Sequence, residues 1–338
     1  MTPGWNVTAI AAHVADAFGG RRRWTSAASV ARASGLAQRG ERPEDDIFAR
    51  VFARRLATAN PADRKAFETA LAEVGVDRAV VERAAASWAP VAAVAGLAAR
   101  WESLPAPARA IVRSPLKAGS VGPVKWGTTH ATQVDQTTCG AASMTIMAMV
   151  TDPFVALWVA TGQVIGDYMP PEVLRVEVDR LPAHTVTDRW NSLQKSTHRA
   201  TTTGAVGPLP WPQALGTPPW RVDNVARCAG LRLRGFVIDD GVPGDLAAGL
   251  AHASAALRDG IPVPAYVGGD VSMGLEAAVP RHVVLVVGRD GDTLRVYEPG
   301  SGAVHELSVG ALAPPHGRLP ALGNWTRLVW LVLPSPRS

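Results

Sequence analysis

The chain has 338 residues, of which 47% are hydrophobic and 19% are charged, and its formal net charge is +5. This composition is typical of a globular protein with one or two domains and excludes a disordered chain. Two cysteines are too few for a disulfide scaffold, and no Cys or His cluster has metal-ligand spacing, so we expect no metal and no other cofactor.

Residues 1–114 are predicted to form an all-helical domain. Asp45 and Asp46 precede IFARVFARRL, whose apolar residues recur at helical spacing. Asn60 followed by Pro61 is a strong helix start, with Asn as the N-cap and Pro at the first position. We find no cluster of reactive side chains in this region. Its expected role is therefore to act as a scaffold or to bind a protein partner.

We expect this chain to have no secretory signal, no membrane span and no nucleic-acid site. The first residues lack the positive start of a secretory signal, so we expect a cytoplasmic protein, with export by a non-standard route left open. The longest apolar run, residues 84–99, contains Pro90 and is too short for a stable membrane span. One basic run, Arg21–Arg23, has no interleaved aromatic residues and indicates a solvated face rather than a nucleic-acid site.

A segment rich in Pro, Gly and Ser, residues 115–124, is predicted to be a linker to a second domain, residues 125–338. Near the start of that domain, the run QVDQTTCGAASMTIMAM (133–149) places Cys139 at the beginning of an apolar helix. That helix, about residues 138–150, should be buried. Thr137 and Thr138 are competent N-caps, and the positive end of the helix dipole favours the thiolate form of a cysteine placed there.

Residues 160–225 are the least regular part of the sequence. They contain PLPWPQALGTPPW (208–220), which could line a substrate cleft or pack as a surface loop. A helix is predicted over 245–260, and strands over 261–268, 282–288, 293–299 and 326–334, with Asp290-Gly291 as a hairpin turn. A helical lobe packed on an antiparallel sheet is an α+β fold.

The second and third of these strands carry polar residues suited to catalysis by Cys139. His282 begins one strand and could take the thiol proton, and Glu298 ends the next strand and could orient the imidazole. Gln133 could donate its amide N–H to a developing oxyanion, although Gln136 is a local rival. In the place of Glu298, Asp270 or Asp292 could serve as the carboxylate.

These motifs together resemble the C39-type, papain-like cysteine peptidases. The resemblance rests on Q-x(5)-C-G-A-A-S, on a His that begins an apolar strand, and on a strand that ends in acid-Pro-Gly, and it covers roughly residues 125–335. It implies a papain-like domain in which Cys139, His282, Glu298 and Gln133 are the catalytic residues. The acid departs from the family, where it is usually Asp. The chain carries no ABC-transporter domain, so the stand-alone branch is the nearer match and no substrate is implied.

Three functions fit this pattern. The first is a cysteine peptidase or amide hydrolase that acts on a peptide or protein substrate through a Cys–His–Glu triad. The second is a thiol deamidase or transglutaminase-like acyl transferase, possible in an effector protein, which would use the same residues. The third is a non-catalytic binding module on a papain-like scaffold, for which an unreactive thiol would be evidence.

Overall fold

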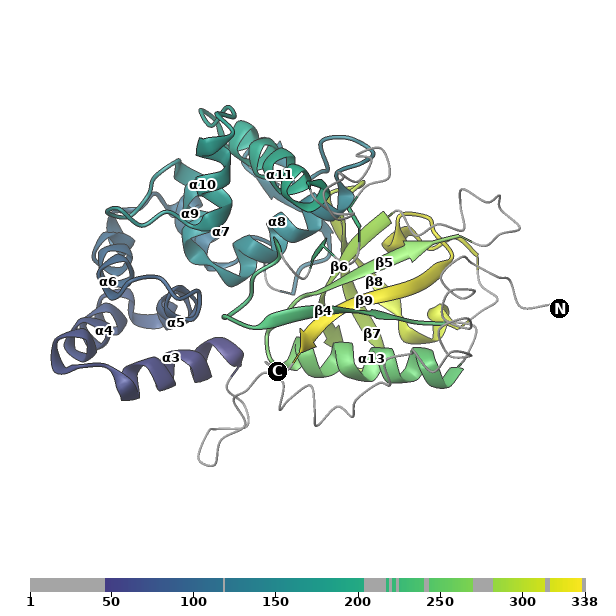
Figure 1. Ribbon diagram of the computed structural model, residues 1–338, viewed down its shortest axis with the longest axis horizontal. Helices are drawn as coiled ribbons and strands as arrows, with labels where there is room; N and C mark the ends of the chain where they lie inside the picture. The colour runs from purple at the N-terminus through teal and green to yellow at the C-terminus, as the bar shows by residue number, and fades with distance from the viewer. Residues whose placement is uncertain are drawn as a thin grey trace.

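The structure is a computed structural model, and it describes residues 46–117, 119–203, 217–218, 221–222, 225–239, 243–269, 282–313 and 317–335. A helical region, residues 47–113, is followed by further helices and a seven-stranded antiparallel sheet, so the predicted α+β class is confirmed. Figure 1 shows the helices of residues 47–202 at one end of the molecule, and the sheet with one further helix along it at the other. The part of the expected N-terminal domain before residue 46 lies outside the described residues.

The N-terminal helices begin where the sequence predicts. Asp46 caps α3 by accepting hydrogen bonds from the backbone N–H groups of Phe48 and Ala49, both at 2.9 Å. Asn60 caps α4, which has proline at its first position. The helices of this region are α3 Ile47–Thr58, α4 Pro61–Val74, α5 Arg78–Ala86, α6 Val91–Arg100 and α7 Ala106–Arg113.

A buried arginine of α5 joins the N-terminal helices to the rest of the molecule. The guanidinium of Arg83 donates to the carbonyls of Val112 and Arg113 at 2.9 Å and to that of Val150 at 2.8 Å. These carbonyls belong to the last turns of α7 and α8, where backbone oxygens lack helical partners and the helix dipole is negative. Burial lowers the pKa of Arg83 to about 10, so the side chain remains a cation at neutral pH.

The sheet has the order β1-β8-β7-β6-β5-β9-β4, and all its neighbouring strands are antiparallel. Its strands are β1 Gly122–Pro123, β4 Arg232–Val237, β5 Val263–Gly268, β6 His282–Asp290, β7 Thr293–Glu298, β8 Ala303–Ser308 and β9 Arg327–Ser335. The four strands that we expected correspond to β5, β6, β7 and β9. The structure adds β4, β8 and the short β1, which lies inside the segment expected to be a linker.

Helices cover both faces of the sheet. Gly249, in α13 (Pro243–Arg258), lies against Leu331 of β9, and the preceding residue, Trp330, stands 6.5 Å from the ring of Tyr266. The Tyr266 hydroxyl donates to the carbonyl of Thr217, which packs against α8 (Cys139–Thr151). Since neighbouring residues of a strand point to opposite faces, α13 and α8 lie on opposite sides of the sheet, as Figure 1 shows.

The expectation that residues 160–225 are irregular is wrong for much of this segment. It contains α10 Pro171–Val178 and α11 Val186–Thr202, which follow α9 Pro153–Thr161. A capping box between Thr185 and Asp188 begins α11. This helix is polar on average and buries many polar side chains, so it lacks the apolar run by which the other buried helices are recognised in the sequence. Of the Pro- and Trp-rich run 208–220, only residues 217 and 218 belong to the described part of the chain.

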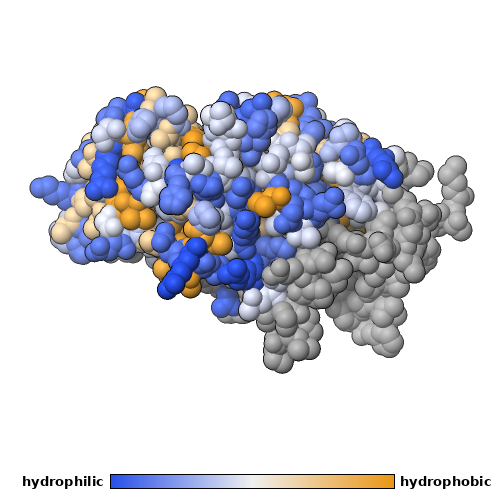
Figure 2. Space-filling model, turned by 90° about the horizontal axis from the view of Figure 1, so that it is seen from above, coloured by the Kyte–Doolittle hydropathy of each residue, from blue (hydrophilic) through white to orange (hydrophobic). Residues whose placement is uncertain are grey.

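The helix that Cys139 begins is buried along its whole length, as predicted, with Val150 alone partly exposed. Among the described residues, no single helix is long and apolar enough to cross a membrane. Only α8 and α9 taken together reach that length and composition, and they meet at a bend of 109°. Figure 2 shows one face of the molecule. On this face, apolar side chains lie mainly over the helical end, where polar side chains are interspersed among them.

We expect Arg83→Met to lower the free energy of unfolding by about 3 kcal/mol, because three helix-end carbonyls, one of them fully buried, would lose a charged donor. Urea denaturation measures this loss. Arg78→Met is the matched control on the same helix, since its side chain is 65% exposed and pairs only with Glu82. That change should cost less than about 1 kcal/mol. Equal losses for the two variants would contradict the structural role of Arg83.

Candidate active site

Cys139 is the first residue of α8 and is 1% exposed. The predicted N-cap role of the threonines is wrong in detail, since the Thr138 side chain does not cap the helix. Asp135 instead organises the turn: its carboxylate accepts from the Thr137 backbone N–H at 2.8 Å, and its carbonyl accepts from the Thr138 hydroxyl at 3.0 Å. This turn delivers the thiol to the end of β6 that carries His282.

The small residue after the cysteine has a packing role. A Cβ atom at Gly140 would come within 2.6 Å of the Thr217 side chain, so only glycine fits there without a shift. Ser143, one turn further along α8, donates its hydroxyl to the carbonyl of Val283 at 3.0 Å. The helix that carries Cys139 is therefore fixed directly to β6, the strand that begins with His282.

His282 lies between the thiol and a carboxylate. Its side chain forms hydrogen bonds with both Cys139 and Glu298, and the distance from Nε2 to the Glu298 Oε1 atom is 2.9 Å. Since Nε2 faces the carboxylate, Nδ1 is the ring nitrogen left for the sulfur. Cys139, His282 and Glu298 thus form one continuous chain of contacts, although 159 residues separate the first from the last.

Glu298 is held by the turn that follows it. Its Oε1 atom accepts from the Gly300 N–H at 2.7 Å, and its Oε2 atom accepts from the Ser301 N–H at 2.6 Å. Glutamate has the extra methylene that lets the carboxylate fold back over its own turn and still reach His282. Burial alone would raise the pKa of Glu298, but these hydrogen bonds outweigh burial and lower it to about 2. The carboxylate therefore remains charged at neutral pH.

The environment of His282 favours its protonated form. Burial by itself would lower the pKa of the imidazole, since it is costly to desolvate a cation. The hydrogen bonds to Cys139 and Glu298, and the negative charge on both, outweigh that cost and raise the pKa to about 9. At neutral pH the ring is an imidazolium, and such a cation beside the sulfur stabilises a thiolate by Coulomb attraction.

A tight turn covers the bond between His282 and Glu298. Gly323 follows the short helix Pro320–Leu322 and has φ of +64°, a left-handed conformation that suits glycine. A Cβ atom at this position would lie 2.5 Å from His282 Nε2 and 3.3 Å from Glu298 Oε1. The bare backbone of Gly323 therefore packs directly on the pair, and no larger residue would fit without moving it.

Gln133 lies on the segment Ala131–Val134, which we call the strap. Its backbone N–H donates to the carbonyl of Pro299 at 2.8 Å, so the strap is bound to the residue after Glu298. The Gln133 side-chain oxygen is buried and has no hydrogen-bond partner among the described residues. Gln136, the rival of Gln133, is exposed. An unpaired buried carbonyl oxygen is unfavourable without a donor, so this side chain has an unmet need for a hydrogen-bond partner.

The strap is held from both sides. The Tyr297 hydroxyl on β7 donates to the carbonyl of Ala131 at 2.6 Å. On the other side, the Trp190 indole of α11 donates to the carbonyl of Thr132 at 2.9 Å. The Gln194 amide, also of α11, donates to the same Thr132 carbonyl at 3.2 Å and accepts from the Val134 N–H at 3.1 Å. Gln194 thus binds both peptide groups that flank Gln133.

The sequence analysis missed Gln194, Trp190 and Asp135. No motif marks the first two, because they lie on a helix that appears irregular in the sequence and 60 residues away from the strap. Asp135 gave a signal, since Asp followed two residues later by Thr is a turn pattern. Of the alternatives to Glu298, Asp292 is 88% exposed and pairs with Arg289, and Asp270 lies outside the described residues.

The second cysteine lies elsewhere in the core. Cys228 is 1% exposed, and burial raises the pKa of its thiol far above the ordinary value. Neither cysteine forms a disulfide. In the described part of the chain, no three His, Cys, Asp or Glu side chains are grouped so that they could hold a metal ion. The chemistry that this site can support is therefore that of a thiolate with an acid–base partner.

Comparison of the chain with protein-family models, with curated proteins and with solved structures finds no match. A functional assignment therefore rests on the geometry of the site and on the sequence motifs around it.

The shifted pKa values of His282 and Glu298 predict how the interaction between these two side chains changes the free energy of unfolding with pH. The pKa of His282 is raised from 6.5 to about 9, so its contribution is complete below pH 6.5 and is lost as pH rises through 9. The pKa of Glu298 is lowered from 4.5 to about 2, so its contribution is complete above pH 4.5 and is lost as pH falls through 2. We expect His282→Gln to cost the most stability, about 3 kcal/mol, between these limits.

Two measurements check this expectation. Unfolding free energies of the wild type and of His282→Gln, taken from pH 3 to pH 10, should differ most between pH 4.5 and pH 6.5, should approach each other toward pH 10, and should approach each other only in part toward pH 3. An NMR titration should give His282 a pKa near 9. A midpoint at the ordinary value for histidine would show that the ring is not coupled to Cys139 and Glu298 as described.

Proposed function

We propose that the chain is a cysteine peptidase or amide hydrolase of papain-like architecture. The observation that carries this proposal is the continuous contact from the Cys139 sulfur through the His282 ring to the Glu298 carboxylate. A nucleophile, a base and an orienting group within hydrogen-bond reach are what thiol hydrolysis requires. The resemblance to C39-type peptidases, drawn from the motifs around the same residues, supports the proposal independently.

In the proposed reaction, the Cys139 thiolate attacks the carbonyl carbon of a peptide or amide bond. The carbonyl oxygen becomes negatively charged and accepts hydrogen bonds from the Gln133 side chain and from the Cys139 backbone N–H. The His282 imidazolium gives its proton to the leaving amine, and a thioester remains on the sulfur. Water, deprotonated by the now neutral His282, then releases the acid and restores the thiolate. Glu298 keeps the ring oriented throughout and stabilises its cationic form.

The reaction product distinguishes this function from its nearest alternative. The full-length protein would be incubated with a denatured proteome digest, and new peptide termini would be counted by mass spectrometry against Cys139→Ala. New termini support peptide hydrolysis. Ammonia release from an intact chain would instead favour a deamidase or acyl transferase, which needs the same side chains. A thiol that no electrophilic probe labels would favour a non-catalytic binding module.

We expect iodoacetamide to alkylate Cys139 at pH 6 while Cys228 remains unlabelled in the folded protein. Both cysteines are 1% exposed, so the expected difference rests on charge: the cationic His282 ring lies beside Cys139, whereas burial raises the pKa of the Cys228 thiol. Peptide mapping after a short exposure measures both sites. His282→Ala is the control and should slow the labelling of Cys139. Equal labelling of the two cysteines, or labelling of Cys228 alone, would contradict the nucleophile assignment.

We expect Gln133→Ala to lower kcat by about 10²–10³-fold, because one oxyanion donor is lost. Gln194→Ala should lower kcat less, by releasing the strap that positions Gln133. A double-mutant cycle separates the two roles, since the cost of Gln194→Ala should largely vanish when Gln133 is already alanine. Ser192→Ala is the matched control on α11, because its hydroxyl bonds the carbonyl of Pro182 instead of the strap. Additive effects in the cycle would mean that Gln194 stabilises the fold only.

A further inference from the structure

A pocket of about 300 Å³ lies on the side of α11 away from the strap. It is formed by α10, by the C-terminal half of α11 and by Arg221. Ser196 and Arg199 reach it from α11, whereas Gln194 lies on another face of that helix because two residues turn a helix by about 200°. The lining residues are Arg175, Val178, Asp179, Ser196, Arg199, Ala200, Thr203 and Arg221. Three arginines and a single acid therefore surround this space.

Several polar atoms of these lining residues are buried without a hydrogen-bond partner among the described residues. They are the Nε and Nη2 atoms of Arg175, the Nε atom of Arg221 and the hydroxyl oxygen of Ser196. Ser196 is 1% exposed. Buried donors without partners are unfavourable, and each is normally explained by a ligand, a water molecule or a functional role. That four such atoms belong to the lining of one pocket indicates a missing acceptor.

The charges around the pocket are unbalanced. Asp179 is bound to Arg199 at 2.8 Å, which neutralises both side chains. Arg221 donates Nη2 to the carbonyls of Thr203 and Ala200 at the end of α11, but these are uncharged acceptors. No carboxylate of the described residues is bound to Arg175, and burial lowers its pKa, although Glu172 and Asp179 attract its charge at longer range. The guanidinium groups of Arg175 and Arg221 therefore belong to the pocket lining without a carboxylate of the described residues bound to them.

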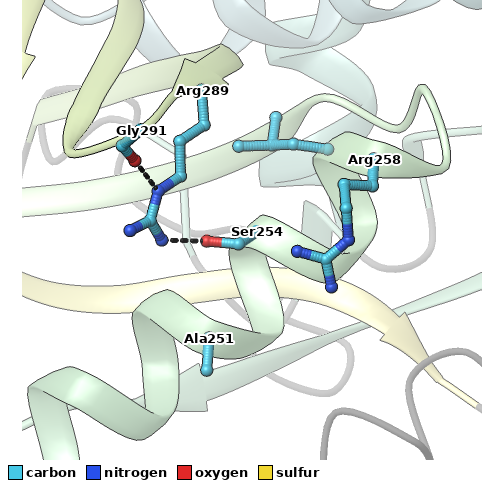
Figure 3. Close-up of a pocket in the computed structure, with 6 residues that line it drawn as sticks. Ala251, Ser254, Arg258, Arg289 and Gly291 are labelled. Carbon is cyan, nitrogen blue, oxygen red and sulfur yellow. Dashed lines mark hydrogen bonds between the residues drawn. The ribbon is translucent and has the colours of Figure 1, made fainter.

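A second arginine-lined pocket, of about 540 Å³, provides a comparison, because the guanidinium group of its arginine Arg289 has hydrogen-bond acceptors. It lies between α13 and the turn that joins β6 to β7 (Figure 3). There Arg289 donates Nε to the carbonyl of Gly291 at 2.7 Å and Nη1 to the hydroxyl of Ser254. The donors of the Arg289 guanidinium already have acceptors, and Arg258, the other arginine of this lining, is exposed, so no buried nitrogen of either side chain lacks a partner among the described residues.

We propose that the pocket between α10 and α11 is a binding site for a phosphate or sulfate group. A tetrahedral oxyanion offers several acceptors at once, and guanidinium groups bind such ions in bidentate fashion. Arg175 would turn toward the ligand without breaking a hydrogen bond, because its Nε and Nη2 atoms form none with the described residues. The hydroxyl of Ser196 would donate to a further oxygen. The inference does not depend on the proposed hydrolase activity.

The test is a binding titration on the full-length wild-type protein. Isothermal calorimetry with inorganic phosphate, and separately with phenyl phosphate, would be run against chloride at matched ionic strength. Saturable binding of one phosphate per chain supports the site. Tighter binding of phenyl phosphate would assign the site to phosphorylated compounds, and tighter binding of inorganic phosphate would assign it to the simple ion. No saturable heat with either probe would overturn the proposal.

Variants locate the site on the chain. Arg175→Met should weaken phosphate binding by about 10- to 100-fold, since a charge-assisted donor is lost, and Arg289→Met should not change it. Ser196→Ala should weaken binding by about 2- to 10-fold without lowering Tm in phosphate-free buffer, because the hydroxyl has no partner there. Ser192→Ala on the same helix should leave binding unchanged. Should Arg175→Met fail to fold, the two serine variants decide. Binding that neither Arg175→Met nor Ser196→Ala weakens would refute the site.

Discussion

The candidate site depends on one short segment that is bound on both sides. The strap, Ala131–Val134, receives hydrogen bonds from Tyr297 and gives one to Pro299 at the sheet, and it is held by Trp190 and Gln194 of α11. A four-residue segment with no regular structure would otherwise leave its peptide groups to water. Because both layers satisfy them, Gln133 has a fixed position beside the turn of Glu298, and the chain enters α8 at a defined place.

The charges at the site are arranged so that each has a partner. The carboxylate of Glu298 takes two backbone N–H groups and the His282 ring, which allows a nearly buried anion to persist. The imidazolium in turn lies between that anion and the sulfur of Cys139. Gly323 excludes solvent from the shared hydrogen bond without adding a side chain. A low local dielectric strengthens these interactions and makes the loss of any one of them costly.

Buried arginines serve two different purposes in this molecule. Arg83 and Arg189 are surrounded by carbonyls at the ends of helices, where a cation compensates the negative end of the dipole. Arg175 differs, because two of its buried nitrogens have no acceptor among the described residues. An arginine side chain can therefore stabilise the fold or remain available to bind a ligand. The number of its N–H groups that have hydrogen-bond acceptors distinguishes these two roles.

Local chemistry in the sequence determined much of the structure. Capping residues such as Asp46 and Asn60 fixed helix starts, the apolar run after Cys139 predicted a buried helix, and Asp290-Gly291 predicted the hairpin that sets His282 and Glu298 on adjacent strands. The α+β class followed from these elements. The resemblance to the C39-type peptidases favoured Gln133 over Gln136, and the structure places Gln136 on the surface.

Only the tertiary structure decided how these residues are held. The polar helix α11 lacks an apolar run because it buries polar side chains such as Gln194, whose partner is a backbone carbonyl 62 residues away in the sequence. Glycine is required at position 140 because Thr217 packs against it, and at position 323 because His282 does. In both cases the neighbour is distant in the sequence, so no local sequence pattern predicts the requirement. Hydrogen bonds between distant segments are set by packing rather than by propensity, so the sequence determined which groups are present, and folding determined which of them meet.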